Sequence, residues 1–390
     1  MTGAGVPEPS RPIRLLAVVH RSTVGGTEVC FERVLGALAS DPAFEVCAAY
    51  PRDGEMVERW DALAPHIPYE VGTLPDRFDL RAYKGWIRRR QLHFDDFEAD
   101  VTAFAPDVIV SFTSVLIAPI DIAARLGVPA VAYVREFVHP SLVRRWLWAH
   151  LAKRAGRLIA VSTPVAEALE PYARGRVRLV HDGVPLPAQT DPSAWPPAAP
   201  LAGFYGGYDP RKGGELFVRM AAKVRETVPD ARFAFHGVAT GGQHAFSGSL
   251  KALATELGLM SSDGPGAALT FVETQDFASS FERNTVVVMP SVREGLGLVA
   301  IDAMSHGVPV VASQTGGLPD VVDDGATGRL VLVGDTAGFA GAVSAIMLDP
   351  TAAAEMGAAA RARVEHLFTV DKAVDGLRDA VREVVAGRSR

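Results

Sequence analysis

Short apolar runs rich in β-branched residues recur along the chain, and an amphipathic helical pattern follows each of them. In the front half these runs predict strands at Arg14–His20, Phe44–Tyr50, Asp107–Phe112, Val128–Val134 and Leu158–Ser162. After Leu201 they predict strands at Ala202–Gly206, Ala231–Gly237, Ala268–Val272, Thr285–Ser291, Val308–Ser313 and Leu330–Val333. Continuous apolar strands that alternate with helices are typical of parallel sheets covered on both faces. The pattern therefore predicts an α/β fold with two doubly wound, Rossmann-like domains facing a central cleft.

A proline-rich stretch separates the two series of strands, with six prolines between Pro185 and Pro200. We therefore expect a disordered lead-in over 1–12, a first domain over 13–186, a linker over 187–200 and a second domain over 201–368. The last segment, 369–390, has a helical pattern and no strand after it. It packs either on the second domain or back across the cleft onto the first. Ligands of open α/β sheets bind at the carboxyl ends of strands, which makes the cleft the expected site.

The composition of the 390 residues is that of a globular protein, with 48% hydrophobic and 22% charged residues. No apolar run approaches the roughly 20 residues that a bilayer crossing needs, and the start of the chain lacks a secretory pattern. Cys30 and Cys47 are the two cysteines, too few for a disulfide framework or a cysteine-based metal site. These features predict a cytoplasmic protein without stable membrane insertion.

The net charge of −6 is unevenly distributed, because the residues up to Pro187 hold 22 basic and 22 acidic side chains and the rest hold 17 and 23. Neither half shows the basic footprint of a nucleic-acid-binding protein. Basic clusters occur at Arg88–Arg90 and between Arg144 and Arg157, and we interpret them as solvated helix faces. The charge pattern predicts no nucleic-acid partner.

A glycine pair follows the first predicted strand, where Gly25 and Gly26 open a helix that runs to about Ala39. Glycines let the backbone approach a ligand closely, and the start of a helix presents free N–H groups. The third glycine of the dinucleotide-binding fingerprint is missing, which counts against a classical NAD domain. The turn is a candidate ligand site, and a tight turn without a ligand is the alternative.

The first strand of the second series runs into a glycine-rich loop, Gly206–Gly214, that carries Arg211 and Lys212. A lysine at the carboxyl end of a strand, beside glycines, can neutralise phosphate oxygens. An exposed loop lysine without a ligand is the alternative.

The segment Met289–Met304 carries the strongest signal. A strand ends there, Glu294 lies on the turn, and a helix that carries Asp302 begins near Gly297. The two acids are eight residues apart, a little over two helical turns, so both carboxylates can face one elongated ligand. Free N–H groups at Gly297 and Leu298 suit an anion.

These motifs resemble those of the GT-B glycosyltransferases of family GT4, which are retaining enzymes that use nucleotide sugars. The resemblance covers nearly the whole chain, from the glycine turn through the Lys loop and the EGxGLV segment to a second glycine pair at Gly316–Gly317. In that family a Glu binds the donor sugar and a second Glu, eight residues on, binds the ribose. The resemblance implies the first role for Glu294 and the second for Asp302, a shorter acid. It also implies that the N-terminal domain over 13–186 binds the acceptor and the C-terminal domain over 201–368 binds the nucleotide sugar. The implied donor-binding residues are Gly25, Gly26, Gly207, Arg211, Lys212, Glu294, Gly295, Leu296, Gly297, Leu298, Val299 and Asp302.

Two positions depart from the family pattern. The Arg that usually precedes the Lys is Gly207 here, and Arg211 is a partial replacement. The His that often follows the strand Val128–Val134 is Arg135, which cannot act as a base but can bind donor phosphate or an acidic acceptor. The alternative is that Arg135 pairs with Glu136 or another acid and holds the end of the strand. We predict Glu294, Arg135 and Lys212 as the catalytic residues.

The reaction that the resemblance implies builds negative charge on a departing diphosphate, which fixed positive groups stabilise. Lys212, Arg211 and the N–H groups of Gly297 and Leu298 suit this task. No Asp-x-Asp pair follows a strand at the cleft, so we expect no metal and no cofactor, with a UDP-sugar as the favoured co-substrate. The family implies attack on the face that the diphosphate leaves, with anomeric retention, and no carboxylate is assignable as a covalent nucleophile.

The acceptor is predicted to be a small molecule, and the Ala-, Arg- and Gly-rich composition of a high-GC bacterium favours specialised-metabolite (antibiotic) biosynthesis. One alternative is a glycosyltransferase for a cell-surface polysaccharide or lipid. Others are a nucleotide-sugar epimerase or hydrolase, a phosphorylase, and a non-catalytic binding or partner subunit. A homodimer is one assembly open to this chain.

Overall fold

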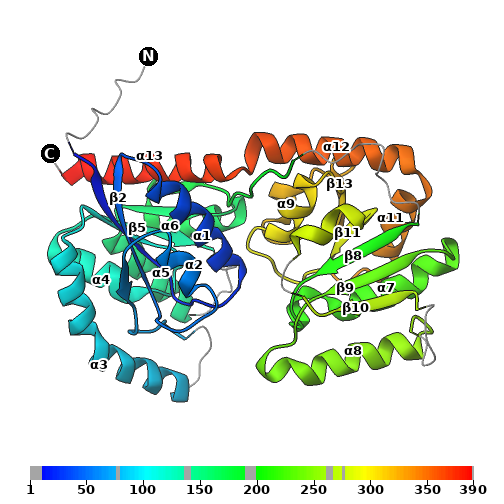
Figure 1. The fold of residues 1–390 in the computed structure, drawn as a ribbon, viewed down its shortest axis with the longest axis horizontal. Helices are drawn as coiled ribbons and strands as arrows, with labels where there is room; N and C mark the ends of the chain where they lie inside the picture. Colours follow the sequence, from blue (N-terminus) through cyan, green and yellow to red (C-terminus); the bar gives the residue numbers. More distant parts are fainter. Residues whose placement is uncertain are drawn as a thin grey trace, which may run out of the picture. The chain divides into compact units, whose positions relative to one another are not determined.

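The chain forms two compact units in the computed structural model, which describes residues 11–75, 80–135, 142–188, 199–260, 267–274 and 277–388. The first unit holds the residues up to Gly183 together with those from Val370 on, and the second runs from Val184 to Thr369. Each unit is a parallel sheet with helices packed on it (Figure 1). Most of the predicted lead-in and linker lies outside the described residues.

The first unit contains a sheet of seven parallel strands in the order β3-β2-β1-β4-β5-β6-β7. The strands are β1 (Ile13–Val18), β2 (Phe44–Tyr50), β3 (His66–Pro68), β4 (Val108–Ser111), β5 (Ala130–Val134), β6 (Arg157–Ala160) and β7 (Val177–Leu179). The five predicted strands are confirmed to about two residues at either end. The sequence pattern missed β3 and β7, because these edge strands are short and only partly buried, so no apolar run marks them.

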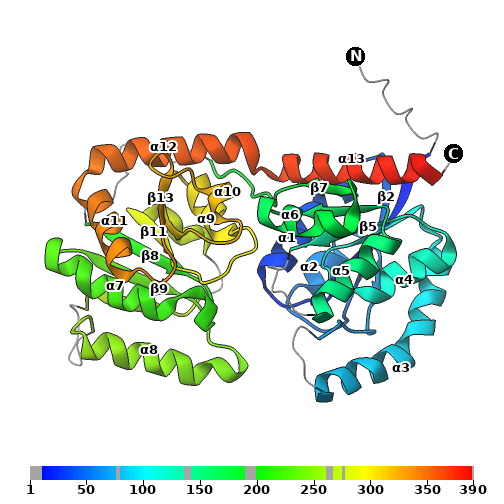
Figure 2. The same cartoon turned by 180° about the vertical axis from the view of Figure 1, so that it is seen from behind.

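Helices connect the strands of the first unit (Figures 1 and 2). They are α1 (Gly26–Ala39), α2 (Val57–Asp61), α3 (Leu80–Phe104), α4 (Ile117–Leu126), α5 (Leu142–Arg154) and α6 (Thr163–Ala173). The central strands are buried almost throughout, as expected for a sheet with helices on both faces. The predicted helix after the glycine pair is α1, which ends at Ala39 as expected.

The C-terminal helix α13 (Val370–Arg388) belongs to the first unit, which is one of the two positions that the sequence left open for it. Its apolar face is buried through Leu377 and Val381. Ion pairs add to this packing, since Glu383 lies 2.7 Å from Arg157 and 2.6 Å from Arg178. Burial of one apolar stripe, rather than chain order, therefore determines where this helix packs.

The second unit contains a sheet of six parallel strands in the order β10-β9-β8-β11-β12-β13. The strands are β8 (Leu201–Tyr205), β9 (Arg232–His236), β10 (Leu269–Val272), β11 (Val286–Met289), β12 (Val310–Ser313) and β13 (Gly328–Val331), and they confirm all six predictions. Both sheets reverse their strand order at one point, between β1 and β4 in the first unit and between β8 and β11 in the second. Ligands of such sheets bind at the carboxyl ends of strands beside this switch point.

Helices also pack on the sheet of the second unit (Figure 2). They are α7 (Gly214–Thr227), α8 (His244–Glu256), α9 (Leu298–Ser305), α10 (Leu318–Val321), α11 (Thr336–Leu348) and α12 (Pro350–Leu367), with 3-10 turns η2 (Pro210–Lys212), η3 (Gly241–Gln243) and η4 (Ala278–Arg283). In the part of the chain that the structure describes, no single helix is long and apolar enough to span a membrane. The pair α11 and α12 meets those criteria only jointly, with a bend of 104° between the two helices.

Candidate functional site

The switch point of the second sheet brings together two predicted site residues that are far apart in the sequence. Lys212 ends η2, on the loop that follows β8, and Glu294 lies on the loop that follows the neighbouring strand β11. The Nζ of Lys212 donates to Oε2 of Glu294 at 2.7 Å, and the Ser291 hydroxyl donates to the same oxygen at 3.2 Å. The Glu294 side chain is 14% exposed. Two donors therefore hold the carboxylate beside the switch point of the sheet, where ligands of such sheets bind.

The two loops are locked to each other by backbone contacts. The amide of Val292 donates to the carbonyl oxygen of Arg211 at 2.8 Å. Gly213 has a φ of +78°, and a Cβ there would overlap the carbonyl oxygen of Pro290. Only glycine adopts this conformation at such close range without strain. The glycine after Lys212 is therefore needed to bring the lysine loop against the Glu294 loop.

The side chain of Arg211 forms an ion pair with an acid on its own loop. Its guanidinium lies 2.6 Å from Asp209, whose carboxylate also accepts from the Arg211 amide at 2.9 Å. Burial alone would raise the pKa of Asp209, but the hydrogen bonds and charge of Arg211 lower it overall. Gly207, at the family's usual Arg position, is exposed at the start of the loop. The geometry therefore favours Lys212 over Arg211 as the cation available to a ligand.

The second glycine pair supports the backbone of Glu294. The amide of Gly317 donates to the Glu294 carbonyl oxygen at 3.3 Å. Gly316 has a φ of +54°, and a Cβ there would overlap the same carbonyl oxygen. Glycine at 316 therefore allows the loop after β12 to close on Glu294, which explains why the motif contains a glycine at this position.

We expect Gly316→Ala to shift Glu294 and to lower both stability and turnover. The strain of a non-glycine residue at positive φ costs about 1–3 kcal/mol, and the overlap with Glu294 adds to it. Gly325→Ala is the matched control, because Gly325 has a φ of +82° and nothing within 4 Å of a Cβ. Chemical denaturation of both variants measures the loss of stability that strain causes. Steady-state kinetics measures the loss of turnover that displacement of Glu294 causes. A loss of turnover of the same size in both variants would contradict the positioning role of Gly316.

The remaining donor-binding candidates of this unit lie at the start of α9. Gly297 precedes the helix with a φ of +107°, and no side chain caps the helix, so the N–H groups of Leu298 and Val299 in its first turn are available to an anion, whereas that of Ala300 donates to Gly297 at 2.9 Å. Leu296 is buried, whereas Gly295, Leu298, Val299 and Asp302 are half-buried. Asp302 lies in the second turn of α9, as predicted. Sequence reasoning omitted Ser291 from the site, although it is part of the same motif.

The glycine pair of the first unit lies at the switch point between β1 and β4. Gly25 caps α1 with its backbone, and Gly26 begins the helix. The buried carboxyl of Glu28 lies beneath this turn, with Oε1 at 3.4 Å from Nε of Arg21, and a Cβ on Gly25 would overlap Oε2. Burial raises the pKa of Glu28, against the lowering effect of Arg21. Sequence reasoning did not assign Glu28 to the site, and its burial is visible only in the fold.

Arg135 follows β5 and is buried, with its side chain 6% exposed. Its Nη1 donates to Oδ1 of Asp182, and its guanidinium lies 4.6 Å from the ring centre of Tyr133. Burial by itself would lower the pKa of Arg135, but the charge of Asp182 raises it, so the guanidinium stays charged. This geometry favours the alternative in which Arg135 pairs with an acid and holds the end of the strand. The acid is Asp182, and Glu136 lies outside the described residues.

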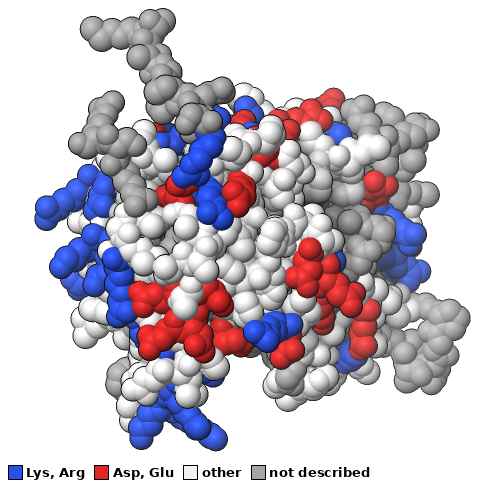
Figure 3. All heavy atoms as spheres, turned by 60° about the vertical axis from the view of Figure 1, so that its left-hand side comes forward, with Lys and Arg blue, Asp and Glu red and all other residues white. Residues whose placement is uncertain are grey.

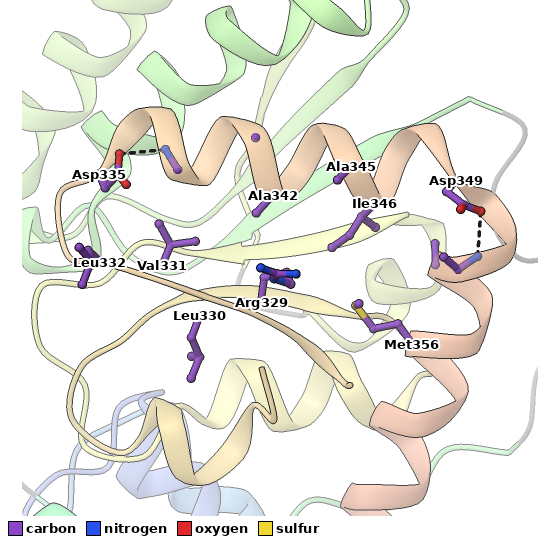
Figure 4. Close-up of a pocket in the computed structure, with 14 residues that line it drawn as sticks. Arg329, Leu330, Val331, Leu332, Asp335, Ala342, Ala345, Ile346, Asp349 and Met356 are labelled. Atoms are coloured by element: carbon purple, nitrogen blue, oxygen red, sulfur yellow. Dashed lines mark hydrogen bonds between the residues drawn. The ribbon is translucent and has the colours of Figure 1, made fainter. Parts of the chain in front are cut away.

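A hollow of about 680 Å³ in the second unit lies away from these residues, among β13, α11 and the start of α12. None of the predicted site residues lines it. Its two aspartates face their own helices, where Asp335 accepts from Gly338 at 2.8 Å and Asp349 accepts from Ala352 at 3.0 Å (Figure 4). These carboxylates are helix caps, and the guanidinium of Arg329, which also lines the hollow, pairs with Asp324 at 3.3 Å.

Metal ligands do not gather in the described ranges, where no group of three or more His, Cys, Asp or Glu side chains is placed to hold an ion. The absence of a metal requirement stays a prediction. On the face drawn in Figure 3, acidic side chains gather in the lower middle and basic side chains lie in separate groups around them. That face carries no continuous basic surface of the kind that binds nucleic acid.

Two family models match the two halves of the chain. The model described as Glycosyltransferase Family 4 matches residues 24–186, and the model described as Glycosyl transferases group 1 matches residues 199–349. Among curated proteins, the D-inositol 3-phosphate glycosyltransferase of Mycobacterium avium is 32% identical over 228 residues, 55% of this chain and 51% of the relative. The enzyme of that name from Streptomyces avermitilis is 33% identical over 258 residues, 60% of this chain and 53% of the relative. The matched region spans about half the length of these curated relatives.

Solved structures share the whole fold at low sequence identity. Anabaena HepE in complex with UDP and glucose has a TM-score of 0.79 at 19% identity, over 95% of this chain and 100% of the neighbour. Sucrose-phosphate synthase from Thermosynechococcus elongatus has a TM-score of 0.78 at 23% identity, over 97% of this chain and 100% of the neighbour. Two family models on successive halves, together with this fold, identify the chain as a member of glycosyltransferase family 4 with the GT-B fold.

Proposed function

We propose that this protein is a retaining glycosyltransferase that moves a sugar from a nucleoside diphosphate sugar, with UDP-sugars favoured, to an acceptor hydroxyl. The observation that carries the proposal is the Lys212–Glu294 pair at the switch point of the second sheet. The pair occupies motif positions of the family, beside an uncapped helix start that suits an anion. The UDP and glucose named with HepE support this choice of donor.

Lys212 is assigned to the departing diphosphate. An ammonium has three N–H donors, and one of them is used on Glu294, which leaves two for phosphate oxygens. A fixed cation at this place stabilises the charge that builds as the sugar–phosphate bond breaks. The first-turn N–H groups of α9 are assigned to the same anion. Asp302, further along that helix, is assigned to the ribose.

Glu294 is assigned to the hydroxyls of the donor sugar. Its carboxylate accepts from Lys212 and Ser291, and its backbone accepts from Gly317, so its position is set before a donor binds. A preorganised carboxylate needs little rearrangement as charge develops on the sugar. The acceptor attacks the face that the diphosphate leaves, and the anomeric configuration is retained.

Incubation with a panel of nucleotide sugars, with and without acceptor mixtures, tests the proposal. A transferase releases nucleoside diphosphate mainly when an acceptor is present, and the NMR coupling of the product's anomeric proton reports retention. Release at the same rate without acceptor indicates a hydrolase, and interconversion of sugars without release indicates an epimerase. A chain that binds every donor without turnover would contradict the proposal in favour of a binding subunit.

Lys212→Ala is expected to weaken binding of UDP by about 1.5–3 kcal/mol, the range for a hydrogen bond to a charged group. Binding of UMP should weaken less, because the cation is assigned to the outer phosphate. Arg211→Ala is the matched control, since Arg211 is held by Asp209, and it should change both affinities little. Titration calorimetry with UDP and UMP measures the difference. Equal losses for the two nucleotides would place Lys212 away from the diphosphate.

For the acceptor we propose a small polar molecule in bacterial specialised metabolism, a choice that the name of the curated relatives supports because D-inositol 3-phosphate is itself small. A cytoplasmic location, independence from metals and a homodimer belong to the same proposal. A second candidate is a cell-surface lipid acceptor. One observation favours it, namely the exposed apolar side chains at the starts of α3 and α5.

A further inference from the structure

The first half of α3 exposes large apolar side chains. Leu80 is 66% exposed, Ile87 46% and Leu92 60%. Ile87 lies two turns before Phe94, on the same side of the helix, and Phe94 and Phe97 are buried against the core. The apolar stripe that the core buries at Phe94 therefore continues to Ile87 and Leu80, where it is exposed.

Basic residues accompany these exposed side chains. From Leu80 to Leu92 the helix carries five basic residues and no acid, whereas its second half is acidic. Lys84 and Arg88 are both exposed; Lys84 lies three residues before Ile87 on the same face, and Arg88 lies four residues after Lys84. Neither forms an ion pair with any residue that the structure describes. A conventional solvated face has acids among its bases, and this face has none.

The start of α5 repeats this composition. Leu142 is 81% exposed and Trp146 is 51% exposed, and Arg145 lies beside them on the same side of the helix. The helix carries four basic residues and no acid. Such a combination on two helices of one unit is unusual for a surface that faces only water.

Topology places the two helix starts at one edge of the first unit. A helix that links parallel strands begins at the carboxyl edge of the sheet, and α3 and α5 follow β3 and β5. Helix α4 packs against both helices. We call the exposed side chains of 80–92 on α3 and 142–146 on α5 the docking edge. It shares the carboxyl edge of the sheet with the glycine pair that begins α1.

We propose that the docking edge binds the surface of an anionic lipid bilayer. Its apolar side chains reach the boundary between headgroups and acyl chains, as those of interfacial amphipathic helices do. Its lysine and arginine side chains extend their charged ends to the lipid phosphates. Charge complementarity favours this occupant, because the docking edge carries basic side chains without acids beside exposed apolar ones, which suits an anionic lipid surface. The proposal concerns peripheral binding and does not depend on which acceptor the enzyme uses.

Co-sedimentation of the full chain with lipid vesicles tests the proposal. We expect binding to an equal mixture of phosphatidylglycerol and phosphatidylcholine, weaker binding in high salt, and little binding to phosphatidylcholine alone. The double variant Lys84→Gln/Arg88→Gln should weaken binding by about tenfold or more, from the contribution of each basic residue near an anionic surface. Ile87→Gln and Trp146→Gln should weaken it as well, through loss of apolar contact.

Lys223→Gln/Arg225→Gln is the control, because it removes the same charge from the second unit. It should bind vesicles like the parent chain, and the melting temperatures of all variants should agree because the changed side chains lie at the surface. Three outcomes would overturn the proposal: no binding of the parent chain to anionic vesicles, equal binding to neutral vesicles, or equal losses in the docking-edge and control variants. If the docking edge binds a protein instead of a membrane, the parent chain should not bind anionic vesicles.

Discussion

Glu294→Gln is expected to lower turnover by about a hundred- to a thousandfold, the range for loss of one preorganised electrostatic contact in a transition state. Glutamine keeps the shape of the side chain but removes the charge that Lys212 and Ser291 hold in place. Affinity for UDP should change little, because the diphosphate is assigned to Lys212 and the helix start. Steady-state kinetics and UDP titration on the same preparation measure both quantities.

The control is Glu273→Gln, which neutralises an acid of the same unit that is exposed and pairs loosely with Lys251 at 3.7 Å. Its turnover should match that of the parent chain. Unchanged turnover in Glu294→Gln would remove Glu294 from the catalytic residues. A large loss of UDP affinity with little change in turnover would instead assign the carboxylate to nucleotide binding.

Arg135→Met is expected to lower the free energy of unfolding by about 3–5 kcal/mol, because removal of one partner leaves a buried charge without compensation. The charge left behind is that of Asp182, which is buried beside the guanidinium. The double variant Arg135→Met/Asp182→Asn should recover much of this loss, since it removes both charges together. Urea unfolding of the three proteins measures the effect.

Arg125→Met is the matched control, because Arg125 pairs with Glu98 at the surface, and such exposed pairs contribute about 0–1 kcal/mol. A catalytic Arg135 would behave differently from a structural one. Its replacement would leave unfolding unchanged and lower turnover, with no recovery in the double variant. That result would restore Arg135 to the catalytic residues.

The sequence by itself was sufficient to predict the two sheets and the loops that carry the site. Parallel strands covered on both faces must be apolar throughout, so each leaves a run that is visible along the chain. The loops are equally local, because Lys212, Glu294 and Gly297 lie within short motifs that follow those strands. The edge strands β3 and β7 escaped prediction because a partly buried strand of three residues leaves no such run.

Tertiary structure decided the partners of these residues. Asp182 lies 47 residues from Arg135 in the chain, and Glu294 lies 82 residues from Lys212, so no local pattern links either pair. The order of strands brings their loops together, and strand order depends on which faces pack rather than on nearby sequence. The same holds for α13, whose apolar stripe fits either unit by periodicity and packs on the first. Composition and period are properties of single segments, whereas a contact requires two segments to meet, and only the folded chain determines which ones do.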